Sequence, residues 1–208
     1  MSRLLLILLA IAGVFASAPA RCAEANASLL DTIAARFARV PVVVSEFTQT
    51  RTLSALTRPV KSSGRLVFAR DKGVIWQIEK PYRAIYVIDE QRIVEIGANN
   101  ERRVRSVKDA PAVAEVGRVF RSIVSGDRKT LADYFRVTAT GEPAHWQLEL
   151  APREKVAPFL KAVSVRGGEF IEQITLQEPS GDRTELRFER HRAESVLAEA
   201  DARLFVTN

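Results

Sequence analysis

The segment that most constrains the fold is residues 64–78, which has the pattern of a β-hairpin. Apolar residues recur at every second position on both sides of a short turn, Asp71-Lys72-Gly73. This period of two predicts two strands that share one apolar face. The residues on that face are Leu66, Phe68, Val74, Trp76 and Ile78. The hairpin therefore predicts a sheet whose apolar side needs a cover.

Segments of the same kind follow along the chain and alternate with helical patterns. We expect strands at 42–51, 60–69, 74–79, 84–88, 92–96, 102–107, 135–140, 146–150, 163–166, 170–177 and 184–190. Apolar residues at spacings of three and four predict helices at 28–40 and 111–125, and shorter helical segments at 128–134 and 154–161. Because the late strands are apolar on one side and charged on the other, the helices must cover the apolar side. The expected fold class is α+β, a curved antiparallel sheet wrapped around one or two helices.

The first residues have the pattern of an export signal. Arg3 precedes an apolar run from Leu4 to Phe15, and Ala18-Pro19-Ala20 fits a cleavage site with small residues. The apolar run is shorter than the roughly 20 residues that a membrane span needs. We therefore predict a signal peptide over residues 1–20, cleaved at a position between 20 and 23, and a mature domain over residues 24–208.

Cysteine usage limits how the mature domain is held together. Cys22 is the one cysteine of the chain, so no internal disulfide is expected. Arg21 stands before it, where a lipid-anchored protein has a small residue, so we expect an exported protein without a lipid anchor. A mature chain of about 185 residues is long enough for one domain with its own core.

The charge of the chain favours acidic partners. The formal net charge is +6, and the densest basic patch is residues 101–105, which we interpret as the solvated face of a strand. Phospholipid headgroups and nucleic acid are both acidic, but export excludes nucleic acid as a partner.

The sequence offers little chemistry for catalysis. The two histidines, His145 and His191, have no partner at metal-ligand spacing. No nucleophile elbow, phosphate-binding loop or dinucleotide fingerprint occurs. We therefore predict no catalytic residues, no metal, no cofactor and no enzymatic activity. A broad apolar face without catalytic residue types favours a protein that binds apolar ligands.

Several short motifs, in this order, resemble the family of LolA, the periplasmic carrier of outer-membrane lipoproteins. Glu46-Phe47-Thr48-Gln49-Thr50 resembles the first strand of the family. Gly64 and Leu66, followed by Arg70 and Trp76, resemble its hairpin with an arginine and a tryptophan. Residues 112–125 are similar to its lid helix, and residues 181–188 to its late strand.

The resemblance implies an unclosed β-barrel, with helices over its opening and an apolar cavity that accepts acyl chains in the periplasm. It also implies that Arg70 acts as a latch, tying the sheet to the lid helix in the closed state. The implied cavity residues come from both the sheet and the helices. They are Phe37, Phe47, Leu66, Phe68, Val74, Trp76, Ile78, Phe120, Ile123, Val124, Trp146 and Leu148.

The resemblance implies acylated lipoprotein or lipid cargo, an inner-membrane release complex, an outer-membrane acceptor and a monomeric carrier. The chain departs from the family pattern in its hairpin turn, which has no proline after Arg70. It also ends soon after Phe205, with little room for a further strand. The alternatives are a carrier of another amphiphile, such as a glycolipid or an aryl polyene, an acyl hydrolase or thioesterase, and an envelope adaptor without a ligand.

Overall fold

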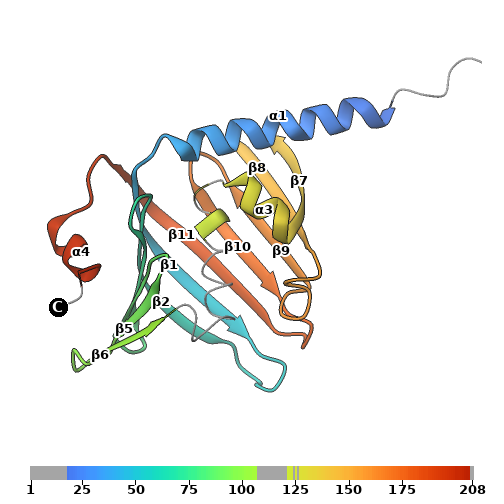
Figure 1. Ribbon diagram of the computed structural model, residues 1–208. Helices are drawn as coiled ribbons and strands as arrows, with labels where there is room; N and C mark the ends of the chain where they lie inside the picture. The colour runs from blue at the N-terminus through green and yellow to red at the C-terminus, as the bar shows by residue number, and fades with distance from the viewer. Residues whose placement is uncertain (1–17, 107–120, 124, 126, 207–208) are drawn as a thin grey trace, which may run out of the picture.

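The computed structural model describes residues 18–106, 121–123, 125 and 127–206. Within these residues, eleven strands form one antiparallel sheet in the order β6-β5-β4-β3-β2-β1-β11-β10-β9-β8-β7. Their bounds are β1 (Val42–Thr52), β2 (Val60–Ala69), β3 (Gly73–Lys80), β4 (Ala84–Ile88), β5 (Arg92–Ile96), β6 (Arg102–Ser106), β7 (Phe135–Glu142), β8 (His145–Pro152), β9 (Ala162–Gly167), β10 (Ile171–Gln177) and β11 (Arg183–Glu194). The sheet curls strongly, and its two end strands, β6 and β7, are not paired with each other in the described residues (Figure 1). The predicted α+β fold with an unclosed antiparallel barrel is confirmed.

Helix α1 (Ala18–Ala38) lies across one end of the curled sheet, above β7 and β8 (Figure 1). It begins at Ala18 rather than at Ser28, because the alanine-rich residues before Ser28 also favour a helix. Its buried residues Leu29, Ile33 and Phe37 recur every four positions and face the sheet. Within the described part of the chain, no helix combines the length and the apolarity that crossing a membrane requires.

The other helical segments differ from the sequence-based expectation in two places. Residues 154–159 form turns instead of the short helix expected at 154–161, since Pro158 has no N–H to donate to the preceding turn. Of the predicted helix at 111–125, the described residues are 121–123 and 125, and they are helical. Helix α3 (Arg128–Tyr134) occurs as predicted, and its first turn is capped by the carboxylate of Asp127. A C-terminal helix, α4 (Glu199–Leu204), was not predicted.

The sheet has apolar residues on both faces over β1 to β5. On the inner face they join α1, Ile123 and the late strands in one large core. On the outer face they form a second cluster, which consists of Val42, Val44, Val67, Ala69, Ile75, Val87, Val94 and Phe205. The end of the chain, with α4, covers this outer cluster.

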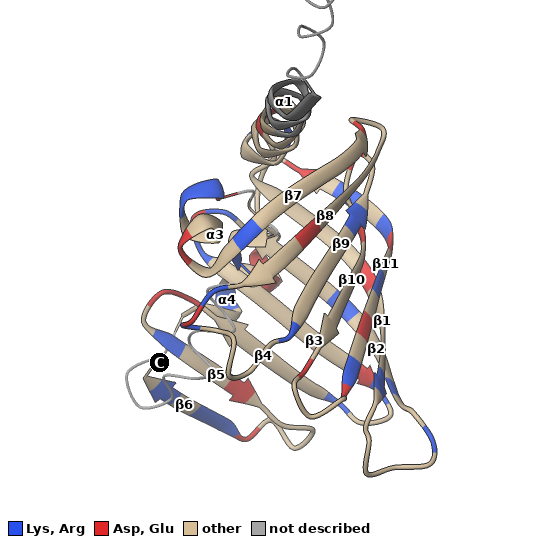
Figure 2. Ribbon diagram, turned by 90° about the vertical axis from the view of Figure 1, so that its right-hand side faces the viewer, with Lys and Arg blue, Asp and Glu red and all other residues tan. Residues whose placement is uncertain are grey.

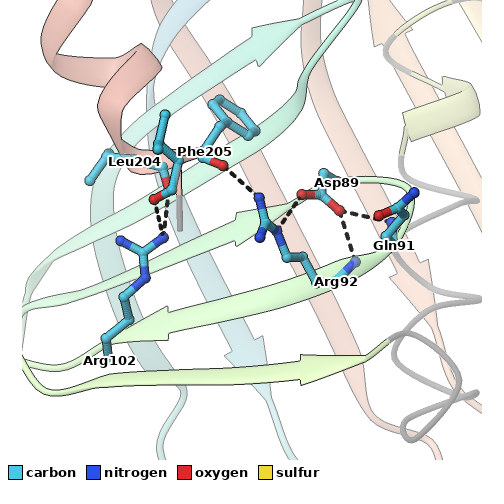
Figure 3. A network of polar contacts seen from close by, with 7 residues as sticks. Asp89, Gln91, Arg92, Arg102, Leu204 and Phe205 are labelled. Atoms are coloured by element: carbon cyan, nitrogen blue, oxygen red, sulfur yellow. Dashed lines mark hydrogen bonds and ion pairs between the residues drawn. The ribbon is translucent and has the colours of Figure 1, made fainter. Parts of the chain in front are cut away.

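Arginines of the sheet fasten α4 to the outer face. Arg65 and Asp201 form a bidentate ion pair, with N–O distances of 2.9 and 2.7 Å. Arg92 donates to the carbonyl oxygen of Phe205 at 2.7 Å, and Arg102 to that of Leu204 at 3.0 Å (Figure 3). These bonds satisfy carbonyl groups at the end of the helix, which have no partner inside it.

Strand β6 forms a basic edge of the sheet (Figure 2). Its arginines Arg102, Arg103 and Arg105 are exposed, which fits the interpretation of residues 101–105 as a solvated strand face. Arg103 forms an exposed ion pair with Glu101 at 3.1 Å.

Candidate functional site

The concave side of the sheet and α1 enclose an apolar interior. Trp76 is partly buried against this core, and Phe120 and Val124 lie outside the described residues. The other predicted cavity residues are all buried in it: Phe37, Phe47, Leu66, Phe68, Val74, Ile78, Ile123, Trp146 and Leu148. Their role as the wall of a ligand cavity remains a prediction.

Aromatic rings line the middle of the interior. Phe47 stacks on Trp76 with ring centroids 3.9 Å apart, and Trp76 meets the edge of Phe188 at 6.4 Å. Gly64 pairs with Phe47 across the strands. A Cβ atom at Gly64 would lie 1.9 Å from the carbonyl oxygen of Gln77, so this close backbone approach requires a glycine. The glycine of the hairpin motif therefore allows the strand packing that places these rings.

A second aromatic contact joins α1 to the late strands. The rings of Phe37 and Trp146 meet edge to face at 5.9 Å, and the indole N–H of Trp146 donates to the carbonyl oxygen of Gly168 at 2.8 Å. A Cβ atom at Gly167 would lie 2.6 Å from the indole ring. The absence of a side chain at Gly167 thus makes room for the buried tryptophan.

Two arginines hold the C-terminal half of α1. Arg36 of the helix donates to the carbonyl oxygens of Pro143 at 2.8 Å and Gly168 at 2.6 Å, on the late half of the sheet. Arg70 of the β2–β3 turn donates to the carbonyl oxygen of Phe37 and, at 3.2 Å, to that of Val40. Both acceptors of Arg70 lie at the negative end of the helix dipole, where a cation is favourable. The arginines therefore fix α1 to both halves of the sheet.

The predicted latch, Arg70, thus has its hydrogen bonds at the C-terminal end of α1, one to Phe37 in the helix and one to Val40 just after it. The resemblance implied bonds to the lid helix, but most of that helix, residues 111–120 and 124, lies outside the described residues. The latch role remains a prediction, and among the described residues the helix that Arg70 holds is α1.

A small cavity remains in the apolar interior beneath the end of α1. Its volume is about 40 Å³, above the roughly 10–15 Å³ that a cavity needs to hold one water molecule. It is lined by Phe37, Val43, Ser45, Leu66, Phe68, Phe170, Ile171, Phe188 and His191. This cavity is too small for a whole acyl chain, which can enter it only if the side chains of its wall or α1 move.

A β-bulge brings His191 to this cavity. The pairing of β1 and β11 shifts around Ser45, so that Arg190 and His191 together oppose this one residue. Arg190 adopts a positive φ of 52°, and the extra residue puts His191 on the same face as Phe188. Without the bulge, the period of two would place Arg190 inside and His191 outside.

The imidazole of His191 contacts two neighbouring side chains. The Ser45 hydroxyl lies 2.7 Å from Nδ1, and the ring of Phe170 stacks on the imidazole at 5.0 Å. Nε2 is buried and has no hydrogen-bond partner among the described residues. Burial lowers the pKa of His191, although the carboxylate of Glu172, the backbone of Phe188 and the carboxylate of Glu169 act in the opposite direction. The imidazole is therefore held in its neutral form beside an apolar cavity.

Sequence reasoning missed Ser45 and His191, since neither belongs to a metal or catalytic motif. One signal was available: Arg190 interrupts the apolar alternation of Leu186 and Phe188, and a charge at an inward position indicates a bulge. Within the described residues, no group of three or more His, Cys, Asp or Glu side chains lies close enough to hold a metal.

A larger and more open groove, of about 680 Å³, lies over β7 to β11. Most of its lining is polar or charged, such as Gln147, Arg166, Gln173 and Arg187. Gln147 stands between the buried Trp146 and Leu148, so its side chain points away from the core. Polar and charged side chains thus make up most of the lining of this groove, whereas most residues that line the interior beneath α1 are apolar, so the interior is the better candidate for an apolar ligand.

The chain was compared with known proteins. A family model described as outer membrane lipoprotein carrier protein LolA-like matches residues 22–183. No curated protein sequence matches at a significant level. The LolA superfamily protein NE2245 from Nitrosomonas europaea has a similar structure, with a TM-score of 0.50 and 8% identity over 88% of this chain and 97% of that one.

Two further solved structures have lower TM-scores. One is a putative outer membrane lipoprotein-sorting protein domain from Vibrio parahaemolyticus, with a TM-score of 0.48 and 10% identity over 88% of this chain and 99% of that one. The other is the MucA/MucB complex of Pseudomonas aeruginosa, with a TM-score of 0.45 and 13% identity over 88% of this chain and 61% of that one.

Proposed function

This chain belongs to the LolA-like family of outer membrane lipoprotein carrier proteins, and we propose that it shields acyl chains in its interior and carries them across the periplasm. The cargo would be an acylated lipoprotein or a lipid on its way to the outer membrane. The observation that carries this proposal is the apolar interior, which an unclosed sheet encloses together with α1.

The energetics of acyl chains support a carrier with such an interior. Burying one CH₂ group contributes about 0.8 kcal/mol, so a chain of sixteen carbons carries roughly 12 kcal/mol of hydrophobic free energy. Such a chain does not cross water unshielded. The carrier must also release it, and cargo that enters a cavity of about 40 Å³ must displace the side chains of its wall. That displacement offsets part of the binding free energy and favours release.

In this proposal α1 is the element that moves, and the bonds of Arg70 and Arg36 to backbone carbonyls hold it in the closed position. Opening the end of α1 beside Arg70 breaks two hydrogen bonds to a charged group. Bonds of this kind contribute about 1.5–3 kcal/mol each. The two arginines therefore set how readily the interior opens.

The partners follow from the family and are part of the proposal. A carrier of this kind receives its cargo from an inner-membrane release complex and delivers it to an outer-membrane acceptor. After β11 the described residues form α4 rather than a further strand. In this proposal a release complex therefore contacts a surface other than such a strand. We propose that the carrier is exported with its signal peptide removed and acts as a monomer.

Native mass spectrometry of the protein purified from the periplasm tests the carrier function. Co-purifying acylated species support it, and their masses separate lipoprotein or phospholipid cargo from a glycolipid or an aryl polyene. A clean protein mass, together with no uptake of a fluorescent fatty acid, would rule the carrier out.

The variant Arg70→Leu tests the role of the latch. We expect it to fold and to release bound lipid to acceptor vesicles several-fold faster than the wild type, since the bonds to Phe37 and Val40 are lost. Arg102→Leu is the matched control, because it removes an arginine that binds backbone carbonyls on the outer face. Release by Arg70→Leu at the wild-type rate would refute the latch.

A further inference from the structure

We propose that Ser45 and His191 form a polar anchor in the cavity wall, where the imidazole N–H donates a hydrogen bond to the carbonyl oxygen of an acyl ester or amide. The inference rests on the proposed function and adds the chemistry that recognises the polar end of the cargo. Its basis is the buried Nε2 atom, which is without a hydrogen-bond partner in the described residues and belongs to a residue that lines the cavity.

The position of the pair is built into the sheet. Ser45 lies at the register shift of β1, and His191 follows the bulge residue Arg190 on β11. The two side chains are thus fixed by the central strand pairing of the molecule rather than by a loop. A bulge at this point turns a polar side chain toward an interior that is otherwise apolar, an arrangement often found beside functional sites.

The hydrogen bond between the pair decides which imidazole nitrogen carries the proton. Ser45 is 2% exposed, and its hydroxyl has no hydrogen-bond contact in the described residues except Nδ1 of His191. A buried hydroxyl hydrogen needs an acceptor, so the Ser45 O–H donates to Nδ1. The neutral imidazole then carries its own hydrogen on Nε2. The unpartnered atom is therefore a donor, and its missing partner is an acceptor.

The surroundings select the kind of acceptor. The carboxylates of Glu172 on β10 and Glu169 before it both act on His191, and a third negative charge near them is unfavourable. An uncharged carbonyl oxygen accepts the same hydrogen bond without that repulsion. This chemistry is shared by the ester carbonyl of a glycerolipid and the carbonyl of an acylated lipoprotein terminus.

The size of the cavity fits one polar group rather than a whole chain. Its volume of about 40 Å³ admits a group the size of a carbonyl beside His191. Phe37, Leu66 and Phe68 form the adjoining walls, and they would have to move to make room for the hydrocarbon that follows. The anchor thereby sets the depth at which the acyl chain lies.

Binding of three probes with the same chain length tests the anchor. The probes are methyl laurate, which has an ester carbonyl, laurate, which is a carboxylate, and dodecane, which has no polar atom. For the wild type we expect methyl laurate to bind about fivefold more tightly than dodecane, the usual net effect of one hydrogen bond. In His191→Phe, which can keep the stack on Phe170, this ratio should fall to about one while dodecane still binds. An unchanged ratio in this variant would overturn the anchor.

The imidazole signals give an independent readout in solution. The chain has two histidines, so NMR of the untagged protein with ¹⁵N-labelled histidine resolves both. We expect methyl laurate to shift the Nε2 and Hε1 signals of His191 but not those of the exposed His145, and Ser45→Ala to reduce the shift. Signals of His191 that do not respond to bound ester would overturn the proposal.

The outcomes separate the anchor from the carrier function. If none of the three probes binds, the carrier function and the anchor both fail. If methyl laurate and dodecane bind equally well, the carrier function stands and only the anchor fails. Release of laurate from the methyl ester in the wild type but not in Ser45→Ala would overturn the anchor in favour of hydrolysis with Ser45 as the nucleophile.

Discussion

The two faces of the sheet over β1 to β5 are both apolar, but they are covered in different ways. The outer cluster lies under α4, and the mostly buried Asp201 is neutralised there by Arg65. Hydrogen bonding to Asp201 raises the pKa of Arg65, so the pair stays charged. The inner core lies under α1 and contains a cavity and Nε2 of His191, which has no hydrogen-bond partner in the described part of the chain.

This difference indicates which face of the sheet can open to a ligand. The described side chains of the outer cluster leave no buried polar atom unpaired, so opening that face would break satisfied contacts without any gain. The inner face has an unsatisfied donor and unfilled space, and both gain from a ligand. We therefore interpret the outer cluster as structural and the inner core as the site of binding. The following predictions test this distinction.

Ile75→Ala in the outer cluster should have the largest effect on stability. Ile75 is fully buried, and truncation there should lower the free energy of unfolding by about 4 kcal/mol, within the range for large-to-small core changes. Urea unfolding measures this effect. Binding of methyl laurate to the folded variant should equal that of the wild type. A change in the affinity of the folded variant would contradict a purely structural outer face.

Asp201→Ala should lower the free energy of unfolding by about 2 kcal/mol. Removing one partner of a buried ion pair leaves the other charge uncompensated, but Arg65 is 30% exposed, so the loss should be smaller than for full burial. Glu199→Ala on the same helix is the control, because its ion pair with Arg203 is exposed and contributes about 0.3 kcal/mol. Equal losses in the two variants would show that the Arg65–Asp201 pair does not hold α4.

Leu66→Ala in the inner core should be less damaging than Ile75→Ala and should change binding. Leu66 lines the existing cavity, so its truncation should lower the free energy of unfolding by about 2 kcal/mol, the low end of the usual range. The enlarged space should take up methyl laurate more tightly than the wild type does. Weaker uptake in a calorimetric titration would contradict the position of the binding site.

The smallest expected effect is the contribution of His191 to the dependence of stability on pH. Burial keeps the pKa of His191 below its ordinary value of 6.5 in the folded state. As the pH falls below that value, the unfolded chain binds a proton that the folded chain does not, so the free energy of unfolding decreases. This contribution is fully present above pH 6.5 and is lost as the pH falls through the folded pKa.

Unfolding measured at pH 7.5 and 5.5 checks this contribution. The loss of stability between the two values should be smaller in His191→Phe than in the wild type. An identical loss in both proteins would show that His191 titrates as it does in the unfolded chain.

Most strands, and the residues of the inner core, could be predicted from local periodicity. The alternation around Leu66 and Trp76 and the helical spacing of Leu29, Ile33 and Phe37 are properties of neighbouring residues, so they can be read without the fold. The prediction of a helix at residues 154–161 was wrong, because Pro158 removes a backbone donor. The proposed lid residues Phe120 and Val124 remain predictions.

The sequence by itself determined an antiparallel sheet with an apolar interior, because the period of an apolar pattern is set by backbone geometry. Only the tertiary structure decided how distant segments meet. The bulge that turns His191 inward depends on the register of β1 against β11. The bonds of Arg70 to α1, and the place of α4 on the outer face, join residues far apart in the chain. Such contacts follow from register and packing, which no local pattern encodes.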